Sequence, residues 1–272
     1  MNLKETKKDA RMLLSGKWPK ALAIALVYLA VTLAINYFSS YTISLAQDLP
    51  VLKLFIYLVV VAAILPLSYG ITATFLDFSK NKKVSCTDFI NKGILSFSKV
   101  WSVTFGIFLK VIVPILICIA IFTVFILVCS YNFGITDENI LTYQYMFATC
   151  YIVIMLVFLV KFLPYALSFM ILADNPELSP KEILSKSAEL MQNRKLEYFT
   201  LCLSFLGWIL LISLICVFAS ISLNSTFVID IIGNIGTIIL APYVLLSQIV
   251  YYKKASTKYE AKDETEKTKE EK

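Results

Sequence analysis

Two lysines inside long apolar runs are the residues with the clearest capacity for chemistry in this sequence. Lys110 and Lys161 each lie in an apolar stretch that is long enough to cross a bilayer. An ionised lysine near the centre of a membrane helix costs roughly 2.5–3.5 kcal/mol, and such residues often mark functional sites. Because the two stretches would run antiparallel, both lysines would lie at a similar depth. The pair therefore predicts a contact site for an anionic lipid or another anion.

Proline lies close to both lysines and removes backbone hydrogen bonds near them. Pro114 cannot donate to the carbonyl of Lys110, and Pro164 frees the carbonyl of Val160, beside Lys161. Backbone that lacks a helical hydrogen bond next to each lysine could take part in the anion site. The alternative interpretation is that each long lysine side chain runs along its helix until the ammonium reaches the headgroups. Both interpretations remain open.

Catalytic and metal-binding chemistry is not expected elsewhere in the chain. The sequence has no histidine, and none of its six cysteines forms a Cys-x-x-Cys pair. It contains neither a GxGxxG motif nor a phosphate-binding loop. Acid–base and nucleophilic catalysis usually need histidine, paired carboxylates or an activated nucleophile. We therefore expect no enzymatic activity, no catalytic residues, no cofactor and no metal site.

The elements that must position the two lysines are membrane helices. Of the 272 residues, 58% are hydrophobic and 16% are charged, whereas soluble domains carry about 25% charged residues. Bilayer hydrocarbon is crossed by about 20 apolar residues in a helix, and the backbone must satisfy its own hydrogen bonds there. We expect an all-α integral membrane protein with six transmembrane helices. The predicted spans are residues 20–38, 54–78, 100–130, 143–173, 198–223 and 227–252.

The distribution of lysine and arginine predicts the orientation of these spans. Basic residues concentrate before the first span, after the second, after the fourth and after the sixth, whereas the other three loops hold only Lys53. Because cytoplasmic loops carry an excess of lysine and arginine, both termini are expected in the cytoplasm. Residues 1–254 would form a single membrane domain. Residues 255–272 alternate lysine with glutamate and are expected to form a disordered cytosolic tail.

The spacing of prolines and amphipathic segments favours a threefold repeat of helical hairpins. Each even-numbered span carries one proline at a similar distance from its cytoplasmic end, namely Pro66, Pro164 and Pro242. Helix kinks are expected at these prolines and at Pro114. Internal repeats are common in transporters, but proline is also common in membrane helices in general. A short amphipathic segment precedes each odd-numbered span, at Thr6–Ser15, Thr87–Phe97 and Ser179–Met191.

A polar motif at the end of the fourth span has a structural interpretation. Residues 174–177 read Asp-Asn-Pro-Glu, and Pro176 is expected to stop the helix as it leaves the membrane. Ser179 and Glu182 have the spacing of a capping box, which predicts the start of the next helix. The motif would then be a helix stop followed by a restart. A binding site is the alternative.

Several short sequences in the second half resemble one bacterial membrane family. Residues 165–178 read YALSFMILADNPEL, residues 203–208 read LSFLGW, and residues 241–243 read APY. In this order they resemble the family catalogued as domain of unknown function 975. The residues that carry the likeness include Asp174, Asn175, Pro176, Trp208, Pro242 and Tyr243.

The resemblance is clear over residues 163–252 and rests on topology alone in the first half. The chain departs from the family where Pro164 is followed by Tyr165 instead of glycine. The family is distantly similar to the membrane domain attached to some glycerophosphodiesterases. The resemblance implies a multi-pass protein of a bacterial plasma membrane, and it implies no activity.

These observations favour a non-enzymatic membrane component that binds lipid or partner proteins. Basic segments next to the spans attract anionic phospholipid at the cytosolic face. A transporter or channel for a small, anionic substrate is the alternative function. The sequence does not identify a membrane-protein partner, and no nucleic-acid partner is expected.

Overall fold

The computed structural model describes residues 2–46, 49–134, 136, 139–223 and 226–270, and this part of the chain contains helices and no strand. The elements, in chain order, are α1 (Leu3–Leu14), α2 (Trp18–Leu45), α3 (Pro50–Ser79), α4 (Asp88–Leu95), α5 (Phe97–Phe133), α6 (Ile140–Phe162), the 3₁₀ helix η1 (Leu163–Tyr165), α7 (Ser168–Asp174), α8 (Pro180–Leu190), α9 (Lys195–Leu203), α10 (Leu206–Leu223) and α11 (Thr226–Glu270).

Six helical segments of the described chain are long and apolar enough to cross a membrane, which confirms the predicted all-α membrane fold. The fourth combines α6, η1 and α7, and the fifth combines α9 and α10. Most run past the predicted bounds, because helical hydrogen bonding continues where the apolar window has ended. The six segments are Trp18–Leu45, Pro50–Ser79, Phe97–Phe133, Ile140–Asp174, Lys195–Ser220 and Ile232–Tyr259.

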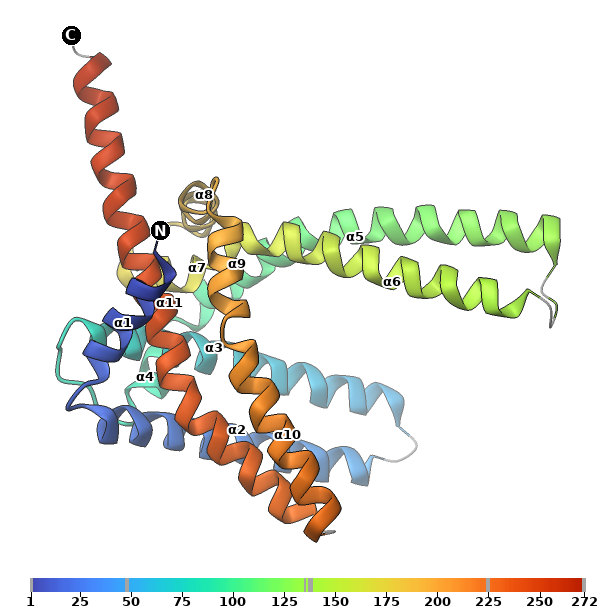
Figure 1. Ribbon diagram of the computed structural model, residues 1–272, viewed down its shortest axis with the longest axis horizontal. Coiled ribbons are helices and arrows are strands. Elements are labelled where there is room, and N and C mark those ends of the chain that lie inside the picture. Colours follow the sequence, from blue (N-terminus) through green and yellow to red (C-terminus); the bar gives the residue numbers. More distant parts are fainter. Residues whose placement is uncertain (1, 47–48, 135, 137–138, 224–225, 271–272) are drawn as a thin grey trace.

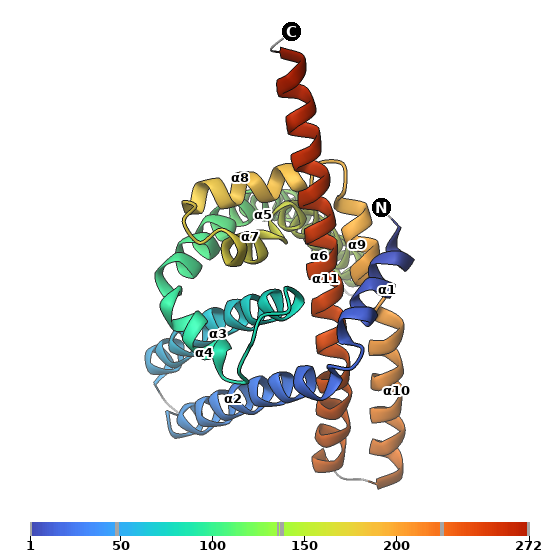
Figure 2. The same ribbon diagram turned by 90° about the vertical axis from the view of Figure 1, so that its left-hand side faces the viewer.

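The spans form three antiparallel hairpins that leave a common base in different directions. Helix α2 packs against α3, α5 packs against α6, and α10 packs against α11. Figures 1 and 2 show the hairpins diverging from the region where α1, α4, α7, α8 and α9 gather. We call this region the hub. It comprises these short helices and the adjoining ends of the six spans.

The buried core lies in the hub and not in the outer parts of the hairpins. It includes Ile24 of α2, Phe75 of α3, Leu167 before α7, and Tyr251 of α11. Farther out, apolar side chains are exposed, as Tyr131 near the end of α5 illustrates with 90% of its surface free. Lipid tails are as apolar as leucine, so spans gain little from burying such residues against one another. The outer parts of the hairpins are therefore surfaces for lipid.

A short helix packs against an even-numbered span at three places in the hub. Helix α4 packs on α3, α8 packs on α7 and η1, and α1 packs on α11. These helices occupy the segments predicted to be amphipathic. Helix α1 precedes the first span but packs on the sixth, so the two ends of the membrane domain meet. The threefold repeat itself stays a prediction.

Two glycines allow α4 to lie directly against α3. A Cβ atom on Gly70 would stand 1.9 Å from the carbonyl oxygen of Phe89, and one on Gly93 would stand 2.6 Å from that of Pro66. Neither distance is compatible with an alanine in the same place. Helix α4 thus lies along the last part of α3 and is not a separate surface helix.

The four prolines expected to kink helices occupy two kinds of position. Pro66, Pro114 and Pro242 lie inside the continuous helices α3, α5 and α11. Pro164 lies in η1, where the α-helical pattern of the fourth span is interrupted. The Ser187 hydroxyl donates a 2.8 Å hydrogen bond to the carbonyl oxygen of Pro164. The interruption is therefore held by a contact with α8.

Residues 255–272 were expected to form a disordered tail, but the first of them are helical and packed against the hub. Helix α11 continues without a break to Glu270. Ala255 is fully buried in the core, and the Tyr259 hydroxyl donates a 2.8 Å hydrogen bond to a Glu189 carboxylate oxygen. Lysine and glutamate are good helix formers, and the first turn has a surface to pack on. The boundary of the membrane domain at residue 254 therefore falls inside a helix.

Candidate functional site at the hub

The structure places the two intramembrane lysines on the surface of the α5–α6 hairpin. Lys110 and Lys161 are both exposed. The Lys110 ammonium lies 5.6 Å from the centre of the Tyr165 ring, a cation–π contact with η1. No hydrogen bond or ion pair between residues of the described chain joins the two lysines. Their role as an anion or lipid contact stays a prediction.

A first ionic cluster connects α3 with α4 around Asp77. Its carboxylate accepts hydrogen bonds from Lys92 of α4 at 2.6 Å and from Lys82 of the following loop at 2.8 Å. Lys92 also donates to the carbonyl oxygen of Ala73 at 3.2 Å. The Asp77 carboxylate raises the pKa of Lys82, because it favours the charged ammonium. The cluster fixes α4 beside the end of α3.

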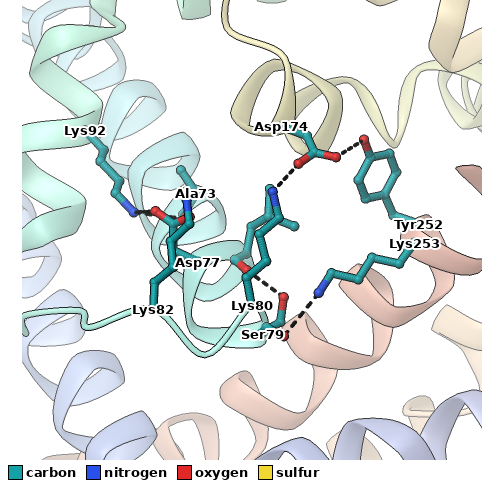
Figure 3. A network of polar contacts seen from close by, with 10 residues as sticks. Ala73, Asp77, Ser79, Lys80, Lys82, Lys92, Asp174, Tyr252 and Lys253 are labelled. Carbon is teal, nitrogen blue, oxygen red and sulfur yellow. Dashed lines mark hydrogen bonds and ion pairs between the residues drawn. The ribbon is translucent and has the colours of Figure 1, made fainter.

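A second cluster joins three even-numbered spans through Asp174, the last residue of α7. One carboxylate oxygen pairs with the Lys80 ammonium, which follows α3, and the other accepts a 2.9 Å hydrogen bond from the Tyr252 hydroxyl of α11. Lys253 of α11 donates to the carbonyl oxygen of Ser79 at 3.1 Å. Figure 3 shows these contacts together. The ends of spans two, four and six are thus tied at one point.

The rest of the polar motif stops one helix and starts the next. The Lys99 ammonium donates to the carbonyl oxygen of Pro176. The predicted capping box is confirmed: the Ser179 N–H donates to Glu182 at 2.7 Å, and the Glu182 N–H donates to the Ser179 hydroxyl at 3.3 Å. The hydrogen bond from the Ser179 N–H lowers the pKa of Glu182, because it favours the charged carboxylate. The motif has a structural role in the hub.

The aromatic motif residues lie near the junction of α9 and α10. The rings of Phe205 and Tyr243 pack edge to face with centroids 5.3 Å apart. Trp208, in the first turn of α10, exposes 56% of its surface. Trp208 lies near the middle of the fifth span.

The packing of α1 on α11 is reinforced by an ion cluster. The Lys254 ammonium lies 2.6 Å from the Asp9 carboxylate and 3.1 Å from that of Glu5. Nearby, Arg194 donates to the carbonyl oxygen of Ala255 at 3.1 Å. Helix α11 is thus held on two sides, by α1 and by the segment before α9.

A cavity of about 800 Å³ lies between the first and third hairpins. Tyr28 of α2, Phe75 of α3, Ile212 of α10 and Pro242 of α11 are among its lining residues, and no lining residue carries a charge. Such a surface matches a hydrocarbon chain and offers no cation to guide an anion.

Nothing in the sequence pattern assigns partners to the polar residues of the hub. Asp77 and Asp174 follow Pro66 and Pro164 at nearly the same spacing, which is the one signal that could have grouped them. Among the residues that the structure describes, no group of three or more His, Cys, Asp or Glu side chains is placed to hold a metal ion. All six cysteines lie within the described residues, and none of them forms a disulfide bond.

The six spans and the helical hub define a multi-pass helical membrane protein. Within that class, residues 1–258 match the model of a protein family described as "Protein of unknown function (DUF975)", and the chain belongs to this family. The predicted resemblance is thereby confirmed and extends over the first half. No match was found among curated proteins or among solved structures. The likeness to a glycerophosphodiesterase membrane domain stays a prediction.

Proposed function

We propose that this protein is a non-enzymatic component of a bacterial plasma membrane that binds anionic phospholipid at the cytosolic face. One observation carries the proposal: the lysine-rich ends of all six spans converge on one hub. Basic residues beside membrane spans attract anionic headgroups, at about 1 kcal/mol for each lysine or arginine. A bacterial cytosolic leaflet would supply those headgroups.

The arrangement of the spans supports lipid binding over transport. The cavity between the first and third hairpins is lined mostly by apolar residues and by no charged one, and the outer parts of the hairpins expose apolar side chains. A pathway for an anion would need polar or cationic groups along it. Transport therefore remains the alternative prediction, without a specific observation in its favour. Binding of a partner membrane protein is likewise untested.

The lipid preference can be measured on the purified protein. We expect native mass spectrometry to show several retained phosphatidylglycerol molecules after delipidation with a mild detergent and addition of defined lipids. Phosphatidylcholine of the same chain length is the control, and it should be retained less. Equal retention of both lipids would contradict the proposal.

The proposed orientation is tested separately in cells. A fluorescent protein fused after Lys272 should fluoresce, and alkaline phosphatase at the same place should be inactive, because both report a cytosolic C-terminus. Active phosphatase would place the hub on the outer side. That result would contradict binding of anionic phospholipid at the cytosolic face.

A further inference from the structure

Helix α1 has three distinct faces. At about 100° per residue, Thr6, Ala10 and Leu14 share one side, and all three are fully buried. The two acidic residues lie on a second side, toward α11. The four basic residues Lys4, Lys7, Lys8 and Arg11 share a third side, within an arc of about 100°.

The acidic face of α1 does not neutralise its basic face. Glu5 and Asp9 both pair with Lys254 of α11. Lys4, Lys8 and Arg11 are exposed and form no ion pair within the described part of the chain. Figure 2 shows α1 lying against α11, beside α9 and α10. The helix therefore presents uncompensated positive charge on its free side.

Lys7 connects this basic face to the junction of α9 and α10, inside the fifth span. Its ammonium donates a 3.3 Å hydrogen bond to the carbonyl oxygen of Ser204 and lies 4.3 Å from the centre of the Phe205 ring. Burial and the nearby positive charge of Arg11 both lower the pKa of Lys7. A bound anion would relieve the repulsion between these two cations.

Helix α1 lies beside the junction of α9 and α10, inside the fifth span, and just before the start of the first span. Ser204 and Phe205 lie directly before α10, and α2 begins with Trp18 shortly after α1 ends. Met12 of α1 is an exposed apolar side chain, and so are Leu203 and Leu206, which flank Ser204 and Phe205 in the chain. Cations thus lie beside a surface suited to acyl chains.

We infer that the basic face of α1, formed by Lys4, Lys7, Lys8 and Arg11, binds the phosphate of an anionic phospholipid whose acyl chains lie along the start of α10. The inference rests on the proposed function and gives it a location. Lysine and arginine at i, i+3 and i, i+4 positions can contact one phosphate together. Soluble compounds also carry phosphate groups, so the experiment must distinguish a lipid headgroup from a soluble phosphate.

The test uses the full chain with Lys4→Gln, Lys8→Gln and Arg11→Gln combined, which leaves the packed Lys7 in place. The control carries Lys83→Gln, Lys181→Gln and Lys258→Gln, three exposed lysines of other hub elements, and therefore has the same change in net charge. Phosphatidylglycerol binding is measured by native mass spectrometry at low ionic strength. The α1 variant should lose affinity by on the order of 100-fold for its tightest lipid, whereas the control should lose much less.

Each outcome has a distinct meaning. Equal losses in the two variants would overturn the α1 site and leave general lipid binding intact. No lipid preference in the unmodified protein would overturn the proposed function as well. Soluble glycerol phosphate, tested by calorimetry, should bind far more weakly than the lipid. If it binds as tightly, the site is one for a free phosphate and the lipid assignment fails. Unchanged thermal unfolding of both variants shows that neither result comes from misfolding.

Discussion

Asp174 illustrates how one side chain can serve several spans at once. Its two carboxylate oxygens contact Lys80 and Tyr252, which belong to two other parts of the hub. The Asp-Asn-Pro-Glu motif is visible in the sequence, and so is the capping box that follows it. The partners of Asp174 are not visible, because they lie 94 and 78 positions away in the chain. Only the packing of three spans brings them together.

Replacing Asp174 by asparagine should weaken the hub. The change removes the attraction for Lys80 and keeps a group that can bond to Tyr252. Because both charged side chains are partly exposed, we expect a loss of about 1 kcal/mol in unfolding free energy. Thermal unfolding in detergent measures it. The matched control is Glu177→Gln, an exposed acid of the same motif with the same charge change. An equal loss in the control would contradict the joining role of Asp174.

At the scale of elements, the helices themselves were readable from the sequence and their packing was not. Long apolar runs predict the spans, because only a helix satisfies its own backbone in lipid. The three short helices follow from apolar spacing and caps. What the pattern could not show is that α4 lies against α3, since this depends on two glycines in different segments. The sequence likewise does not predict that the first residues after 254 are helical, because the surface on which they pack comes from α1 and α8.

Gly93 offers a direct test of the contact between α4 and α3. Gly93→Ala should destabilise the protein by about 1–3 kcal/mol, because the new methyl group would overlap the carbonyl of Pro66 and push the helices apart. Gly207→Ala is the control, since no heavy atom lies within 4 Å of a Cβ there. In a helix that change should be neutral or stabilising by up to about 1 kcal/mol. Similar melting temperatures for the two variants would argue against the close packing.

At the scale of the whole molecule, the N-terminal helix and the sixth span close the hub. The sequence predicts six spans and one basic side, and it contains no signal for the divergence of the hairpins. Divergence depends on where burial occurs, and the core residues come from all three hairpins. The sequence also does not predict the charge pairing between α1 and α11, because Lys254 is one of several lysines at the end of the sixth span.

Reversing the charge of Lys254 should separate the two ends of the domain. Lys254→Glu places a third carboxylate beside Glu5 and Asp9, so unfolding in detergent should occur at lower temperature. Combining it with Asp9→Lys restores an opposite pair and should recover part of the loss. The coupling energy from the double-mutant cycle should be about 0.5–1 kcal/mol for such partly exposed groups. Additive effects would mean that the pair does not hold α1 in place.

The meeting of α1 with α11 has a consequence for how the protein is made. Helix α1 is translated long before α11, yet the two helices pack against each other in the hub. Contacts so distant in sequence form late, after the chain has reached the bilayer. Until α11 has been made, α1 therefore lacks the helix on which it packs. A chain whose translation stops before the sixth span would lack the part of the buried core that α11 contributes.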